Sequence, residues 1–224
     1  MRLFASADLH GFWDVYDWLV GLVGSHKPDG VVLAGDLLGF PDGYDTVEEA
    51  QAADAQKAVA RLSAITCPVF YVMGNDDWVD LDPPVPNIES VHGRRVSFGD
   101  FNVVGYQYTL PFMGGINEIP EHEMEQDLAE LGVLVDQKTV LVTHGPAHGA
   151  CDKVTIGGHA GSTSLRELVN RSRPRAHIHG HVHYWFGRDG CHFNAASAGQ
   201  KRAMIIDLET MEHKVVEEAQ VSGG

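Results

Sequence analysis

Five short apolar segments of this chain each run directly into a cluster of polar residues, and this arrangement constrains the fold more than any other feature. The segments span residues 3–7, 31–34, 69–73, 140–142 and 175–179. Near-continuous apolar runs of this length, bounded by glycine, are typical of strands that are buried on both faces. In open α/β sheets, ligands bind outside the carboxyl ends of the strands. Because polar residues follow all five segments, the sequence predicts one shared site at that edge.

The rest of the chain shows helical and further strand patterns. Helices are expected at 13–23, 46–62, 120–134 and from 164 to the residue before Pro174, and further strands at 94–97, 102–105, 184–187, 191–194 and 202–207. Thr46 and Glu49 have the spacing of a capping box. Residues 106–119 form the one long loop, and such loops in compact domains often act as lids. Without a linker or repeat, residues 1–224 are expected to form a single domain.

Composition excludes several classes of protein. The chain has 31 acidic and 16 basic residues, a net charge of −15, which repels polyanions and disfavours nucleic acid and anionic membranes as partners. Three widely spaced cysteines without a CxxC pair argue against a disulfide framework. With no leader pattern and no membrane-length apolar run, we expect a cytoplasmic protein. Its oligomeric state is left open. The 13 histidines indicate metal chemistry, since histidine is the usual neutral metal ligand.

The polar clusters contain seven side chains of the metal-ligand type: Asp8, His10, Asp36, Asn75, His144, His181 and His183. Asp8 and His10 lie on the same side of an extended segment, and the two oxygens of Asp36 allow it to bridge two cations. Seven nitrogen and oxygen ligands are too many for one tetrahedral zinc and suit two ions such as Mn, Fe, Co, Ni or Zn. Two ions roughly 3.5–4 Å apart clamp a phosphoryl group and generate hydroxide at neutral pH.

The order D-x-H, G-D, G-N-D, H, G-H-x-H resembles the calcineurin-like metallophosphoesterase superfamily over about residues 2–200. A second block, residues 143–146, 158–162 and 179–183, resembles its Icc-related and 239AB-like branch of predicted phosphoesterases. The resemblance implies a four-layer αββα fold of two mixed β-sheets flanked by helices. It also implies two metal sites that share Asp36: Asp8, His10 and His183 complete one, and Asn75, His144 and His181 complete the other.

The sequence departs from the family pattern at Asp76, where the family has a histidine thought to protonate the leaving oxygen. We therefore expect Asn75 and Asp76 to be the residues beside the reacting phosphate. The favoured function is a dinuclear metal-dependent phosphoesterase that hydrolyses a small phosphodiester, or a phosphomonoester with an easy leaving group, through a metal-bound hydroxide. The alternative is a metal-binding scaffold on the same fold with little catalysis. A nuclease is disfavoured by the negative charge.

Two further histidines, His148 and His159, fall in the second family-like block. They are candidates for lining the substrate pocket, and packing or solvent exposure is the competing interpretation.

Overall fold

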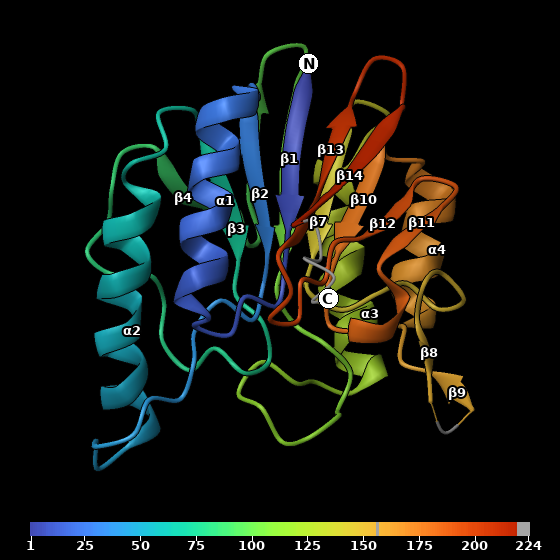
Figure 1. The fold of residues 1–224 in the computed structure, drawn as a ribbon. Helices are drawn as coiled ribbons and strands as arrows, with labels where there is room; N and C mark the ends of the chain where they lie inside the picture. Colours follow the sequence, from blue (N-terminus) through green and yellow to red (C-terminus); the bar gives the residue numbers. More distant parts are fainter. Residues whose placement is uncertain (156, 219–224) are drawn as a thin grey trace, which may run out of the picture.

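The computed structural model describes residues 1–155 and 157–218, and it contains two six-stranded sheets packed face to face between two pairs of helices (Figure 1). The first sheet has the order β14 (His213–Glu217), β13 (Arg202–Asp207), β1 (Arg2–Ser6), β2 (Gly30–Ala34), β3 (Val69–Val72) and β4 (Ile88–Ser90). The second has the order β11 (Gly187–Asp189), β12 (His192–Asn194), β10 (Ala176–His179), β7 (Thr139–Thr143), β6 (Phe101–Tyr106) and β5 (Arg95–Phe98).

Three apolar layers separate these elements. The middle layer lies between the sheets and takes Leu3 and Ala5 of β1, whereas Phe4 points to the opposite face of the same strand. On that outer face, α1 (Trp13–His26) and α2 (Val47–Leu62) cover the first sheet. The helices α3 (Glu121–Leu131) and α4 (Thr163–Ser172) cover the second sheet. The αββα architecture predicted above is therefore confirmed.

Both sheets are mixed, with a parallel centre. In the first, β1, β2, β3 and β4 run parallel, and β13 pairs antiparallel with β1. In the second, β6, β7, β10 and β12 run parallel, and β5 and β11 are antiparallel edges. The carboxyl ends of the five predicted strands consequently meet at one edge of the sandwich. The burial of β2 and β3 on both faces explains why their sequences are nearly all apolar, whereas β7 and β10, equally buried, also contain threonine and histidine.

Several sequence-based boundaries need correction. Residues 183–185 form the short 3-10 helix η2 (His183–Trp185) where a strand was predicted over 184–187. The cap of α4 is Ser162, whose hydroxyl accepts from the Leu165 amide, so the helix begins before residue 164. The predicted helix 120–134 ends at Leu131 and is followed by η1 (Gly132–Leu134). The cap at Thr46 is confirmed by its bond to the Glu49 amide.

Four strands lie outside the prediction. They are β4 and β14 at the edges of the first sheet and the small hairpin of β8 (Lys153–Val154) and β9 (Gly158–His159). Residues 107–119 form the predicted long loop, which an isolated bridge closes between Thr109 and Glu118. Among the described residues, no helix combines the length and the apolar character that crossing a bilayer requires.

Candidate metal centre

The strand ends at this edge turn sharply, and the turns direct polar side chains toward each other. Asp8, His10, Asp36 and His181 all have positive φ angles, of 55°, 42°, 51° and 68°. Left-handed backbone is uncommon for residues other than glycine, and such residues cluster at functional sites. All four were predicted as metal ligands from the sequence. The backbone therefore adopts a costly conformation at the predicted ligands.

One half of the cluster joins the first and last motifs. The Nε2 atom of His183 lies 3.0 Å from Asp8 Oδ1 and 3.4 Å from the Nε2 atom of His10. Both oxygens of Asp8 also accept from the His181 backbone amide at 3.1 Å, which fixes the carboxylate. Asp8 is fully buried, whereas the side chain of His183 is 40% exposed. This group can hold a cation, because its ligand atoms lie within 4.8 Å of one another.

The other half is built around the Asn75 amide oxygen. That oxygen lies 3.0 Å from His144 Nε2 and 3.0 Å from His181 Nδ1. His144 is fully buried and its Nδ1 donates to the carbonyl of Ala34, so Nε2 is the nitrogen that faces the cluster and that offers a lone pair when the ring is neutral. The structure therefore brings this amide and both imidazoles to one place.

Asp36 lies between the two halves. Its Oδ2 atom is 3.2 Å from His144 Nε2 and 3.7 Å from His10 Nε2. Burial alone would raise the pKa of Asp36, but the facing His144, with His10 and His181, holds it well below its usual range. Burial would likewise lower the pKa of His144, and the charge of Asp36 instead raises it to about 10. The buried carboxylate thus demands a positive charge beside it, which a proton or a metal cation can supply.

The donor set fits two divalent cations. The Nε2 atoms of His10 and His183 lie 3.4 Å apart, and a cation between them would be bound by the lone pairs of both neutral rings. Glycines allow the backbone to close on the ligands: a side chain at Gly74 would clash with Asp36, and one at Gly180 would clash with Asp8. Mixed imidazole, carboxylate and amide ligands suit borderline metals such as Mn, Fe or Zn.

Asp76 also lies at the cluster. Its backbone amide donates to Asp36 Oδ1 at 3.0 Å, and its side chain accepts from the Asn75 amide nitrogen at 3.1 Å. Burial, and then the charge of Asp36, raise the pKa of its carboxyl. Together with His10 and Asp36 it forms a third group that could bind a metal. The residue that departs from the family pattern therefore lies at the cluster and adds a carboxyl group there.

Two supporting acids were missed by the sequence prediction. Asp77 is buried and accepts from the amides of Leu37, Leu38 and Gly74, which ties the turn after β2 to the turn after β3. Burial, and then the charge of Asp36, raise its pKa to about 7, against the effect of these amides. Its place at the end of the G-N-D-D motif could have indicated this role. Glu118 accepts from the Asn75 amide nitrogen at 3.3 Å, and no sequence pattern marks it.

A buried chain of hydrogen bonds lies behind the turn that carries His144. Arg166 Nη1 donates to His192 Nε2 at 2.9 Å, and because arginine only donates, His192 carries its proton on Nδ1. That proton is directed at His177 Nδ1, 2.8 Å away, so His177 donates through Nε2 to Thr143 Oγ1 at 2.8 Å. Thr143 in turn donates to the carbonyl of Gly145. The chain is satisfied only while both histidines are neutral.

The structure does not bring His148 and His159 to the cluster. Their rings contact each other with centroids 4.5 Å apart, and His159 Nδ1 lies 2.7 Å from Asp152 Oδ1. This bond to Asp152 holds His159 in a neighbouring cavity of about 490 Å³ rather than in the cavity that contains the ligand side chains. The cavity that contains the ligand side chains measures about 280 Å³. It is lined by apolar side chains together with His10, Asp36, Asn75, Asp76, His181 and His183.

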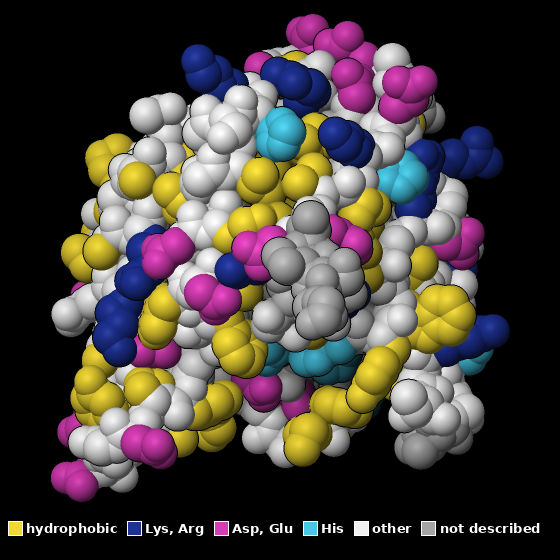
Figure 2. Space-filling view, in the orientation of Figure 1, with side chains coloured by type: hydrophobic (Ala, Val, Ile, Leu, Met, Phe, Trp, Pro, Cys, Tyr) yellow, Lys and Arg dark blue, Asp and Glu magenta, His cyan; other side chains and the backbone are white. Residues whose placement is uncertain are grey.

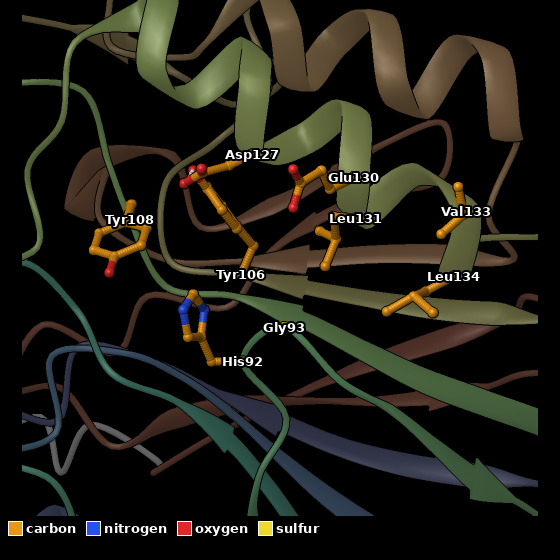
Figure 3. Close-up of a pocket in the computed structure, with 9 residues that line it drawn as sticks. All are labelled: His92, Gly93, Tyr106, Tyr108, Asp127, Glu130, Leu131, Val133 and Leu134. Carbon is orange, nitrogen blue, oxygen red and sulfur yellow. Dashed lines mark hydrogen bonds between the residues drawn. The ribbon is translucent and has the colours of Figure 1, made fainter.

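Figure 2 shows this face of the molecule, where histidine side chains lie in a hollow beside acidic and hydrophobic ones. A cavity of about 410 Å³ lies elsewhere, on the outer face of the second sheet between β6 and α3 (Figure 3). There the Tyr106 hydroxyl donates to Asp127 at 3.0 Å, and the rings of His92 and Tyr108 complete one side. None of the possible metal-binding groups among the described residues lies in that cavity, whereas each of those groups has residues in the lining of the smaller one.

A family comparison agrees with this geometry. The model of the calcineurin-like phosphoesterase family matches residues 1–185, which include every predicted ligand. The chain belongs to the calcineurin-like phosphoesterase family. Its assignment to the Icc-related and 239AB-like branch stays a prediction. No curated protein matches the chain by sequence.

Solved structures share the calcineurin-like fold with this chain at low identity. The protein TT1561 of Thermus thermophilus is 16% identical, with a TM-score of 0.69 over 96% of this chain and 98% of that one. A dimetal phosphatase from Danio rerio is 15% identical, with a TM-score of 0.66 over 97% and 98%. Another structure, 18% identical, gives a TM-score of 0.80 over 96% and 98%. At these identities the similarity establishes the fold.

Proposed function

We propose that this calcineurin-like protein is a dinuclear metal-dependent phosphodiesterase acting on a small phosphate ester. The observation that carries the proposal is the position of Asp36, whose one carboxylate oxygen faces His144 of one half of the cluster and His10 of the other. A carboxylate so placed can bridge two cations. The similarity to a dimetal phosphatase from Danio rerio supports a dimetal centre that hydrolyses phosphate esters.

The proposed ligands divide into two sets that share Asp36. Asp8, His10 and His183 complete the first set, and Asn75, His144 and His181 complete the second. When bound, two divalent cations generate a nucleophile from water at neutral pH and offset the charge of the phosphoryl oxygens. Mn, Fe, Zn, Co and Ni all suit this ligand set, and the choice among them is left to metal analysis.

The chain's own residues prepare the site for this chemistry. The Asn75 amide nitrogen donates to Asp76 and Glu118, which turns its oxygen toward His144 and His181. Asp8, Asp36 and Asp76 supply three negative charges and Glu118, which accepts from Asn75, supplies a fourth, so two divalent cations would leave a net charge of about zero. A phosphodiester monoanion adds one negative charge to this centre, whereas a phosphomonoester dianion adds two. The charge at the site therefore favours diesters.

Asp76 also limits the leaving group. Its carboxylate accepts from Asn75, and two bound cations would oppose the rise in its pKa that burial and Asp36 cause. Asp76 would then be ionised and a poor proton donor to a departing alkoxide. Esters whose leaving oxygen departs without a proton, such as phenolates, avoid this requirement. Replacing Asp76 with His should raise the rate on alkyl phosphomonoesters, and an unchanged rate would contradict a missing proton donor.

The proposal is tested by hydrolysis of bis(4-nitrophenyl) phosphate with Mn²⁺ added after chelation. We expect turnover that depends on the metal and that falls by at least about 100-fold in His144→Ala and Asp36→Asn. His122→Ala is a matched control, because its exposed side chain lies on α3 outside the cluster. Metal-independent turnover, or turnover that survives both substitutions, would overturn the proposal.

A metal-binding scaffold is the second candidate, and Asp76 is the observation that favours it. Bound metal without turnover on a panel of monoesters, cyclic nucleotides and linear diesters would favour the scaffold. A cytoplasmic location and the absence of nucleic acid as a partner stay predictions from the sequence.

A further inference from the structure

Half of the residues that line the cavity over the candidate metal centre are apolar. We call them the apolar wall: Phe112, Met113, Val154, Ala160, Val182 and Tyr184. The other lining residues are five of the proposed ligands and Asp76. An ester whose phosphate lies at the ligands can therefore place a substituent beside this wall.

The wall exposes large apolar side chains to solvent. Met113 is 81% exposed, Tyr184 77% and Phe112 58%. The Phe112 ring also meets His181 edge to face, with centroids 5.2 Å apart, so it adjoins a proposed ligand directly. Contiguous exposed apolar side chains are costly in water and mark binding sites. A ligand that covers them would recover that cost.

Glu118 holds the wall in a fixed position relative to the ligands. Its carboxylate accepts from the backbone amides of Phe112, Met113 and Gly114 at 2.8, 3.1 and 3.0 Å. The same carboxylate accepts from the Asn75 side chain at 3.3 Å. Gly115 lets the loop approach the Asn75 backbone, because a side chain there would clash with it. The wall is thus preorganised, and less entropy is lost when a ligand binds to it.

Within residues 1–155 and 157–218, no lysine or arginine lines this cavity. Arg202, the arginine on the His183 side, donates to the backbone carbonyls of His183 and Ala196 at 2.9 Å and stacks on Phe186. Recognition of a second phosphate or a carboxylate normally uses Arg or Lys. The substituent beside the wall is therefore expected to be uncharged.

From these observations we infer the substrate class: a phosphodiester whose retained ester group, the one that does not leave, is a neutral aromatic group that lies against Phe112, Met113 and Tyr184 while the phosphate lies at the ligands. This inference rests on the proposed phosphodiesterase function. It goes further by excluding a second phosphate or a carboxylate as an occupant of this cavity, because no lysine or arginine is among the described residues of its lining.

The test compares phenyl 4-nitrophenyl phosphate with methyl 4-nitrophenyl phosphate. Both release the same nitrophenolate and differ only in the second ester group. After correction for their rates with hydroxide, we expect kcat/KM to be at least about 10-fold higher for the phenyl ester. Phe112→Ala should reduce this ratio to about 3 or less, mainly by raising KM for the phenyl ester. Phe40→Ala is the matched control, because Phe40 is 54% exposed yet lies outside the cavity lining.

Binding supplies a readout that does not depend on turnover. Saturation-transfer NMR with the Zn-loaded protein should show transfer to the ring protons of phenylphosphonate, and Phe112→Ala but not Phe40→Ala should abolish it. Equal corrected kcat/KM values for the two esters, with metal-dependent turnover of both, would overturn the inference and leave the proposed function standing. If neither ester is turned over, the proposed function is refuted instead. The transfer to the ring protons of phenylphosphonate would then still show whether an aromatic group binds at the apolar wall.

Discussion

Acid should destabilise this protein through the buried histidine chain, and His192 allows the size of the effect to be worked out. Its Nε2 accepts from Arg166 and its Nδ1 donates to His177, so the fold holds the neutral ring. Burial, and then the positive charge of Arg166, lower the pKa of His192 from 6.5 to about 4. The unfolded chain binds the proton first. The stability that His192 contributes is therefore complete above pH 6.5 and is lost as the pH falls toward 4.

The gap of about 2.5 pKa units corresponds to about 3 kcal/mol at pH 4, since one unit is worth about 1.36 kcal/mol. That is a large share of the roughly 5–15 kcal/mol by which domains are stable. The assay is urea unfolding of EDTA-treated protein between pH 7 and pH 4.5. His192→Gln should flatten the dependence of the unfolding free energy on pH, and the exposed His122→Gln should leave it as in the wild type. A His192→Gln variant whose pH dependence equals that of the wild type would refute the reasoning.

Three further substitutions test the site and the fold. Gly180→Ala should release bound metal because the added methyl group would clash with Asp8, whereas Gly21→Ala, which meets nothing within 4 Å, should retain it; metal content decides. Glu118→Gln should weaken Mn²⁺ binding about 10-fold in calorimetry by loosening Asn75, and equal affinity would show that Asn75 needs no such support. Ser162→Ala should cost at least about 1 kcal/mol of unfolding free energy through loss of the α4 cap and of the bond to Glu121, whereas Thr163→Ala, at an exposed position, should cost little; equal losses would contradict the assigned cap.

The sequence predicts the core of the fold well because that part is encoded locally. Strands such as β2 and β7 are buried along their whole length, so their apolar runs are continuous. The ligands follow these runs directly, and parallel pairing brings the strand ends together. The edge strand β14 gives no such signal, because four of its five residues are exposed and its sequence is largely polar.

The residues that support the site could not be predicted, because no local sequence pattern marks them. Glu118 lies 43 residues from Asn75, and their contact depends on a loop whose path is set by backbone hydrogen bonds to the Glu118 carboxylate. The apolar wall is likewise assembled from loops and from the β8–β9 hairpin, where no periodicity marks its members. For His148 and His159 the sequence pattern was misleading. Their place in a family-like block predicted that they line the substrate pocket, whereas the bond to Asp152 holds His159 in another cavity.

The central claim is that Asp36 joins two metal ions in one centre, and metal stoichiometry tests it most directly. Chelated protein would be reloaded with Mn²⁺, desalted and analysed by mass spectrometry beside Asp36→Asn. We predict about two ions per chain for the wild type and no more than about one for the variant, with loss of diesterase activity in parallel. A wild type that retains less than half an ion per chain, or an Asp36→Asn variant that keeps two, would contradict the claim.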